Sequence, residues 1–204
     1  MMSNSDLEFE AKFFVGKNLA AVRARLLENG ATLHKERVFE RNVRYENQWD
    51  GLYRKGQLLR LRQDSQAKLT FKGPAKEDIT SEVKVREELE VVVSDFDTMD
   101  TILRRIGFRP VQVYEKYRET FSFNTIEVVL DEMPYGAFVE LEGNETTIKS
   151  SAITLGLDWD TRLITNYLAI MAQVKQAYNL DFDDLTFANF TDWNGDLATL
   201  LATA

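Results

Sequence analysis

The stretch Glu8-Phe9-Glu10-Ala11-Lys12 carries a charged side chain at every second position. In a β-strand, residues i, i+2 and i+4 share one face, and the residues between them share the other. We therefore expect Glu8, Glu10 and Lys12 to point to one side, and Phe9 and Ala11 to the opposite side. Such a strand separates a charged surface from an apolar one.

The same alternation recurs in five further stretches. Residues 86–90 and 140–142 are mainly acidic, and residues 59–62, 68–72 and 116–118 are mainly basic. A chain with this many two-sided strands builds a charged wall. That wall faces either water or an enclosed space.

The composition is that of an ordinary globular domain. The 204 residues, 44% hydrophobic and 28% charged, suit one domain or one domain with an appendage. There is no long apolar run, no signal-peptide core and no cysteine, so we expect a cytoplasmic protein without a transmembrane helix. The net charge of −8 disfavours broad binding to nucleic acid or to membranes.

The periodicity of the chain predicts eight strands and three helices. The strands are expected at 6–15, 36–47, 57–64, 67–73, 82–94, 112–123, 126–131 and 137–143. The helices are expected at 18–29, from Asp95 or Asp97 to 106, and at 161–178. A turn is expected at Trp49-Asp50-Gly51 and a polar loop at 75–80.

The two halves of the chain follow one order, which is a strand, a helix and three further strands. This order indicates a weak internal duplication of a four-strand unit. Two such units give about eight antiparallel strands, which are enough to close a barrel and remove open edges. We therefore expect a β-rich α+β fold, with helices packed outside an eight-stranded antiparallel barrel.

Two features indicate that the charged faces point into this barrel. Like charges lie next but one on the same face, as in Glu88 and Glu90, whereas a solvated strand usually alternates in sign. The helices at 18–29 and 96–106 carry apolar stripes, for which the opposite faces of the strands would supply partners. The alternative, with charged faces in water around an apolar interior, stays open from periodicity alone.

An interior lined by like charges needs ions to fill it. Two carboxylates about 5 Å apart repel by roughly 3 kcal/mol at an effective dielectric constant near 20, and oxygen ligands favour Mg²⁺ or Mn²⁺ over zinc. The glutamates expected to bind such a metal are Glu8, Glu10, Glu88, Glu90, Glu140 and Glu142. The cations that need an anion, for which a chain of phosphates is the obvious candidate, are Lys12, Arg60, Arg62, Lys72, Arg86, Lys116 and Arg118.

Together these stretches resemble the CYTH superfamily, also called triphosphate tunnel metalloenzymes. Residues 8–12 resemble its ExExK motif, residues 59–62 its LRxR strand and residues 69–74 its LTxKGP stretch. Further matches, in the order of the family, are residues 86–90 (RxExE), 116–118 (KxR), Asp131 with 136–142 (D…GxFxExE) and 165–168 (SYxxLL). The resemblance covers about residues 6–178. It implies a closed tunnel that holds a triphosphate together with Mg²⁺ or Mn²⁺.

For hydrolysis in such a tunnel, we expect the carboxylates to divide between two metals. One metal is expected on Glu8, Glu10 and Glu142 or a subset of them, and a second metal nearer Glu88, Glu90 and Asp131.

Lys12 is expected to contact phosphate. A further role as a catalytic base stays open, because desolvation lowers the pKa of a lysine and adjacent carboxylates raise it. Tyr45 stands where the family has a tyrosine near this lysine, and it is a catalytic candidate with a packed strand aromatic as the alternative.

Three further basic residues have less certain places. Arg41 falls opposite Lys116 in the internal repeat and is expected to line the tunnel. Arg86 is expected to bind substrate or to pair with the glutamates, and Lys68 is expected to be solvated.

Three functions remain open at this stage. The first is metal-dependent hydrolysis of inorganic triphosphate, thiamine triphosphate or a nucleoside triphosphate. The second is a class IV-type adenylyl cyclase that converts ATP to cyclic AMP and pyrophosphate, and the third is a tunnel that binds polyphosphate or a phosphorylated ligand without turnover. No GxxxxGK[ST] loop supports a P-loop nucleotide site.

The resemblance divides the chain into a tunnel domain at 1–178 and an extension at 179–204. In the extension, aspartates alternate with Phe182, Phe187, Phe190 and Trp193. We expect an amphipathic segment packed on the outside of the barrel, with a contact between two copies of the chain as the alternative.

Overall fold

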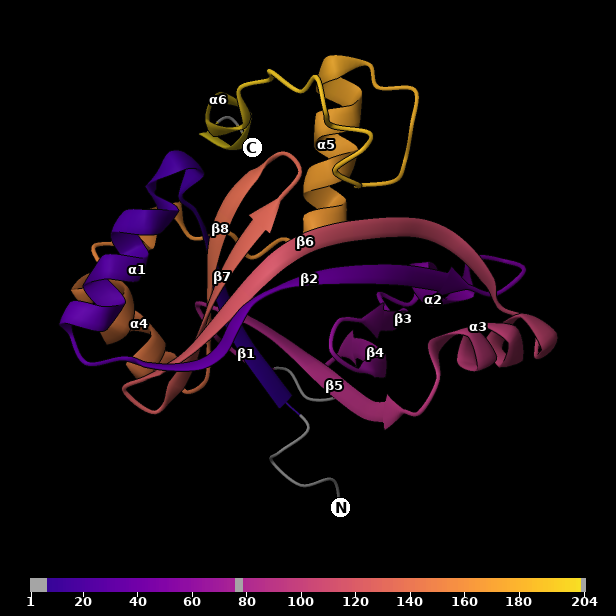
Figure 1. The fold of residues 1–204 in the computed structure, drawn as a ribbon, viewed down its shortest axis with the longest axis horizontal. Helices are drawn as coiled ribbons and strands as arrows, with labels where there is room; N and C mark the ends of the chain where they lie inside the picture. The colour runs from indigo at the N-terminus through magenta and orange to yellow at the C-terminus, as the bar shows by residue number, and fades with distance from the viewer. Residues whose placement is uncertain (1–6, 76–78, 203–204) are drawn as a thin grey trace.

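A computed structural model describes residues 7–75 and 79–202, and part of the loop predicted at 75–80 lies outside them. The described residues form a closed barrel of antiparallel strands in the order β1-β5-β4-β3-β2-β6-β7-β8 (Figure 1). The strands are β1 (Leu7–Phe14), β2 (Thr32–Glu46), β3 (Leu58–Gln63), β4 (Ala67–Pro74), β5 (Lys84–Val93), β6 (Arg109–Phe123), β7 (Ile126–Met133) and β8 (Gly136–Glu142). The predicted eight-stranded antiparallel barrel is confirmed.

Helices cover the outside of the barrel. They are α1 (Leu19–Glu28), α2 (Gly51–Arg54), α3 (Phe96–Arg105), α4 (Glu145–Thr154), α5 (Tyr167–Tyr178) and α6 (Leu197–Ala202). Helices α1 and α3 match the prediction. Each is followed within two residues by a glycine at positive φ, Gly30 at +81° and Gly107 at +99°, where a side chain would be strained.

Other helices differ from the prediction. The helix expected at 161–178 begins only at Tyr167, because Asn166 caps it by accepting a hydrogen bond from the backbone N–H of Ala169. The turn expected at Trp49-Asp50-Gly51 leads directly into the short helix α2. Helix α4 was not predicted, and Asn144 caps it in the same way as Asn166 caps α5.

The apolar faces of the strands form the cores between the barrel and its helices. Leu26 of α1 and Ile148 of α4 pack with Phe121 and Leu141 on one side of the barrel. On another side, α3 lies against β2 and β3. The apolar material of the fold therefore lies outside the barrel wall, as predicted, and the interior is left to the charged faces.

The C-terminal extension packs against β6 and α5. The backbone N–H of Leu185 donates to the carbonyl of Val113 at 2.9 Å, and the N–H of Glu115 donates to the carbonyl of Leu185 at 2.9 Å. Phe190 and Leu197 are buried in one cluster with the apolar face of α5. Within the described residues, no helix is both long and apolar enough to cross a membrane.

Candidate functional site

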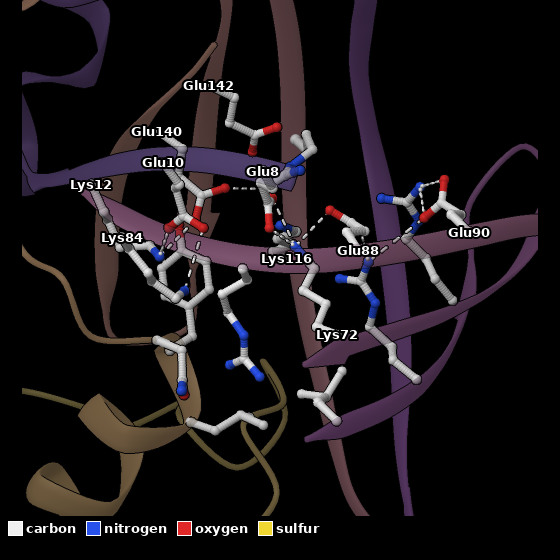
Figure 2. A pocket seen from close by; sticks show the side chains of 18 of the residues that line it. Glu8, Glu10, Lys12, Lys72, Lys84, Glu88, Glu90, Lys116, Glu140 and Glu142 are labelled. Atoms are coloured by element: carbon white, nitrogen blue, oxygen red, sulfur yellow. Dashed lines mark hydrogen bonds and ion pairs between the residues drawn. The ribbon is translucent and has the colours of Figure 1, made fainter. Parts of the chain in front are cut away.

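The barrel encloses a charged cavity of about 360 Å³ (Figure 2). Its wall is built from charged residues at alternate positions of β1, β3, β4, β5, β6 and β8. The predicted site residues that line it are Glu8, Glu10, Lys12, Arg60, Arg62, Lys72, Arg86, Glu88, Glu90, Lys116, Arg118, Glu140 and Glu142. The charged faces therefore point inward, and the alternative of a solvated wall around an apolar interior is wrong.

The register of the strands sets acids against bases across the sheet. Lys12 of β1 lies directly opposite Glu140 of β8, and Lys72 of β4 lies directly opposite Glu88 of β5. Directly opposed side chains on one face of an antiparallel pair lie close enough to interact. The alternation seen in the sequence thus becomes a set of cross-strand ion pairs.

Lys12 is the most enclosed of these cations. It is 1% exposed, and its Nζ lies 2.5 Å from Glu10 and 2.9 Å from Glu140. The ring of Tyr167, from α5, lies 4.3 Å from the same nitrogen. Burial acts to lower the pKa of Lys12, but Glu10 and Glu140 outweigh it and raise that pKa above its ordinary value. Lys12 is therefore a fixed positive charge, and this direction does not favour a role as base.

Lys72 joins two of the acidic strands. Its Nζ lies 2.7 Å from Glu8 on β1 and 3.0 Å from Glu88 on β5. Burial acts to lower the pKa of Lys72, but the two carboxylates raise it. Glu90 on β5 is held by Lys68 at 2.7 Å and by Arg62 at 3.4 Å, so Lys68 lines the cavity and is not simply solvated.

Glu142 differs from these paired carboxylates. It has no ion-pair partner within residues 7–75 and 79–202, and Figure 2 shows it apart from the linked lysines and glutamates. Burial, with Glu8 and Glu140 nearby, raises the pKa of Glu142 to about 8. Burial also raises the pKa of Glu8. One part of the cavity thus holds more carboxyl groups than its lysines and arginines can pair with.

Asp131, one of the predicted metal ligands, is placed differently from the glutamates of the cavity. It is fully buried and is not among the residues that line the cavity. Its carboxylate accepts hydrogen bonds from Lys116 at 2.9 Å, from Arg118 at 2.7 and 2.6 Å and from the hydroxyl of Tyr167 at 2.9 Å. With both oxygens engaged, Asp131 holds two cations from behind and has no oxygen directed at the cavity.

Arg41 and Tyr45 are corrections, because the structure places them on the outside of the barrel. In the register of β2 and β6, Glu40 is paired with Lys116 and shares its inward face, so Arg41, at the next position, faces outward. The guanidinium of Arg41 lies 5.6 Å from the ring of Phe96 in α3. Tyr45 is fully buried against α3 and donates a hydrogen bond to Asp100 at 2.5 Å, which is the packed-aromatic alternative.

Arg86 lines the cavity but is tied to the main chain. Its guanidinium donates to the carbonyl of Gly73 at 3.3 Å and to that of Gly56. Within the part of the chain that the structure describes, Arg86 is joined to none of the glutamates of the cavity by an ion pair.

The lining also includes residues that were not predicted, among them Lys84, Tyr114, Glu127 and Tyr167. Lys84 has the same strand parity as Arg86 and reaches Glu10 at 3.4 Å, and Tyr114 has the parity of Lys116 and accepts from Arg60 at 3.2 Å. If the alternation had been applied to every second residue of β5 and β6, Lys84 and Tyr114 would have been predicted. Glu127 sits opposite Glu142 in the register of β7 and β8. Tyr167 comes from a helix, so no strand periodicity pointed to it.

The sequence profile of the CYTH domain matches residues 6–155. The chain belongs to the CYTH family. Enzymes of this family hydrolyse triphosphates or act as adenylyl cyclases, and they typically use divalent metals.

Three relatives illustrate the likeness. A protein of Methanocaldococcus jannaschii named a putative adenylate cyclase is 28% identical over 141 residues, which are 68% of this chain and 71% of its own. The structure of a putative adenylate cyclase from Vibrio parahaemolyticus has a TM-score of 0.71 and 20% identity, over 82% of this chain and 98% of that one. A Hippeastrum protein, described as a putative adenylyl cyclase with a dominant triphosphatase activity, has a TM-score of 0.58 and 15% identity, over 80% and 93% of the two chains. The two solved structures support the same fold.

The carboxylates of the cavity are the kind of ligand that a divalent cation prefers, but in this structure they are not grouped around one point. Across the described residues, no group of three or more acidic or histidine side chains is gathered closely enough to hold a metal ion. The reason is that most of the glutamates are turned toward lysines and arginines. Glu142 and Glu8 nevertheless have pKa values raised by burial and by neighbouring carboxylates. A cation among oxygen ligands would relieve that repulsion.

Proposed function

We propose that the protein hydrolyses a triphosphate inside its tunnel with the help of Mg²⁺ or Mn²⁺. The observation that supports this most is that one cavity has two differently charged sides. We call the side with Arg60, Arg62, Lys72, Lys116 and Arg118 the basic wall, and the side with Glu8, Glu10, Glu88, Glu90, Glu140 and Glu142 the acidic wall. Side chains that could grip phosphate oxygens lie within reach of carboxylates that could hold a cation. A metal-chelated chain of phosphates carries both kinds of charge and would satisfy both walls.

In this proposal the basic wall binds and orients the substrate. Arg60, Arg62, Lys72, Lys116 and Arg118 contact the non-bridging phosphate oxygens, and Lys12 adds a further contact near the acidic wall. The arginines offer planar donors that match a phosphate group, and the buried lysines are point charges. Because burial weakens screening, these cations stabilise charge that develops on the phosphates during in-line attack.

The acidic wall would hold the metal. Glu8, Glu10 and Glu142 are the residues proposed for a first cation, and Glu88 and Glu90 those for a second, with Asp131 withdrawn. A bound divalent cation neutralises phosphate charge and lowers the pKa of a water molecule. Glu140, held between Lys12 and Arg118, also remains among the proposed ligands.

An adenylyl cyclase is the second candidate. It is favoured by the 28% identity to the Methanocaldococcus jannaschii protein, whose name carries that activity. A cyclase shares the need for a tunnel that grips three phosphates. It differs in using the ribose 3′-hydroxyl as the nucleophile in place of water.

One experiment separates these functions. The purified protein is incubated with Mg²⁺ or Mn²⁺ and with inorganic tripolyphosphate, thiamine triphosphate or ATP, and free phosphate and cyclic AMP are measured in the same samples. Phosphate release without cyclic AMP is the expected result. Cyclic AMP with pyrophosphate would replace the proposal by the cyclase, and binding without any product would indicate a non-catalytic phosphate-binding protein.

A further inference from the structure

A buried carboxylate stands behind the basic wall of the cavity. Glu40 of β2 is 1% exposed, and it is not among the residues that line the cavity. Its oxygens lie 3.6 Å from a terminal nitrogen of Arg62 and 3.7 Å from Nζ of Lys116. Both of these cations do line the cavity, so Glu40 faces the phosphate-binding side chains from the rear.

Glu40 does not act as a hydrogen-bonded anchor. Neither of its carboxylate oxygens has a hydrogen-bond partner among the described protein groups. The distances of 3.6 and 3.7 Å exceed those of direct hydrogen bonds. Asp131 differs in this respect, because both of its oxygens accept short hydrogen bonds from the cations that it holds. The two carboxylates behind the basic wall therefore differ: Asp131 is hydrogen-bonded to its cations, and Glu40 is not.

The charge of Glu40 persists despite its burial. Burial acts to raise the pKa of Glu40, but the surrounding cations, led by Lys116, lower that pKa to about 2. At neutral pH the carboxylate is ionised. It therefore subtracts one unit of charge from the wall that would attract phosphate.

We propose that Glu40 is a built-in counter-anion that weakens the grip of Arg62 and Lys116 on phosphate and so lets products leave. The inference rests on the proposed function, because it presumes that phosphates occupy the cavity. The physical basis is that tight binding shared equally by substrate and product does not raise kcat. Without Glu40 the basic wall would carry one more unit of net positive charge and would hold a short polyphosphate product longer. Glu40 is thus a positioning residue that acts through its neighbours and does not touch the substrate.

The test is the isosteric change Glu40→Gln. The deciding result is whether this change raises or lowers the affinity for phosphate compounds. Calorimetry with inorganic tripolyphosphate and with pyrophosphate, in the absence of metal, is expected to show both bound roughly tenfold more tightly by E40Q than by the wild type. With metal present, KM for tripolyphosphate should fall and kcat should fall with it. If Glu40 were only structural, its loss would disorder the wall and weaken binding.

The matched control is Glu132→Gln. Glu132 lies on the outer side of β7, where it pairs with Arg37 at 2.6 Å, so this change removes the same charge from outside the tunnel. It should leave the affinity for tripolyphosphate unchanged. If E40Q does not fold by circular dichroism, Glu40→Asp keeps the charge but withdraws it by one methylene, and a smaller tightening is expected.

The outcomes separate this inference from the proposed function. Equal or weaker binding by the Glu40 variant overturns the inference even if the protein is a triphosphatase. Tighter binding by E40Q with no phosphate release by the wild type supports the weakening of the grip on phosphate, and it overturns both hydrolysis and the release of its products. If neither the wild type nor E40Q binds tripolyphosphate, both are wrong.

Discussion

At the scale of single residues, the tunnel places cations whose contacts differ in strength. Arg62 is 9% exposed and lies no closer than 3.4 Å to the carboxylates of Glu90 and Glu40. Its terminal nitrogens are therefore not committed to a short ion pair, and they are available to a phosphate. Arg118 is bound at 2.6 Å to Asp131 and at 2.5 Å to Glu140, which fixes its direction.

This difference makes Arg62 the clearest test of the basic wall. We expect Arg62→Ala to lower kcat/KM for a triphosphate by about 10²- to 10³-fold, the usual effect of removing one donor to developing charge. The fold should persist, since no tightly bound partner is left unpaired. Arg37→Ala is the control, because Arg37 pairs with Glu132 on the outer surface. Equal rates for the wild type and R62A would remove Arg62 from the site.

The anchoring role of Asp131 leads to a prediction about stability. Asp131→Asn leaves the buried Lys116 and Arg118 without their shared carboxylate, and breaking a buried pair in this way typically costs about 3–5 kcal/mol. Urea unfolding should show a loss of that order, while E132Q, a change at the next position, should show little. A D131N protein as stable as the wild type would contradict the anchoring role.

Glu40 also predicts a dependence of stability on pH. Its folded-state pKa of about 2 lies below the ordinary value of 4.5. The ionised form is therefore favoured by folding, and its contribution is present above about pH 4.5 and lost as the pH falls toward 2. We expect E40Q to be less stable than the wild type by about 3 kcal/mol at pH 7, with the gap narrowing in urea titrations below pH 4. A gap that stays constant down to pH 3 would exclude this linkage.

At the scale of elements, the outside of β2 is held by α3. Tyr45 donates to Asp100, which also accepts from Arg104 at 2.8 Å in the same helix. Val43 and Leu61 share the apolar contact with Phe96. This packing explains a tyrosine near the tunnel without giving it a role in catalysis.

Tyr45→Phe therefore separates the two explanations. It should reduce the free energy of unfolding by about 1 kcal/mol, the usual worth of one hydrogen bond, because only the bond to Asp100 is lost. The kcat/KM for a triphosphate should not change. A tenfold fall in kcat/KM with the fold intact would return Tyr45 to the list of catalytic candidates.

The elements also show what the sequence could predict. All eight strands were predicted because alternation is local and most strands keep a mainly charged and a mainly apolar face. The inward direction of the charges followed from like charges next but one, as in Glu88 and Glu90. The placement of Arg41 failed because a shift of one residue reverses the face of a strand, and an internal repeat does not fix register to one residue.

The places of other residues in the site did not follow from strand periodicity. Tyr167 reaches Asp131 and Lys12 from the start of α5, and only the packing of that helix on the barrel brings them together. Asp131 was expected as a ligand from the resemblance to the family, and a sequence motif does not show whether a carboxylate reaches the cavity or stays behind other side chains. Glu40 belongs to the same class of residue.

At the scale of the whole molecule, the tunnel is a closed wall whose opposite charges now satisfy each other. Lys12 is bound by Glu10 and Glu140, and Lys72 by Glu8 and Glu88. A guest of one sign alone must therefore compete with an internal ion pair, and it leaves the opposite partner buried and uncompensated. A cation and a polyanion that enter together replace both partners at once.

This exchange predicts that metal and polyanion bind cooperatively. Mg²⁺ alone and tripolyphosphate alone should each raise Tm slightly, whereas both together should raise it by clearly more than the sum, when measured before appreciable turnover. By linkage, each ligand should then tighten the other by the same factor in calorimetry. The affinity of Mg²⁺ for tripolyphosphate in buffer is measured separately and subtracted.

Glu142→Gln should reduce the synergy. Glu142 has no lysine or arginine partner in the described ranges, so a cation can bind its carboxylate without breaking an ion pair. Purely additive shifts in Tm would mean that the two walls act independently, and a shared metal-phosphate guest would then be excluded.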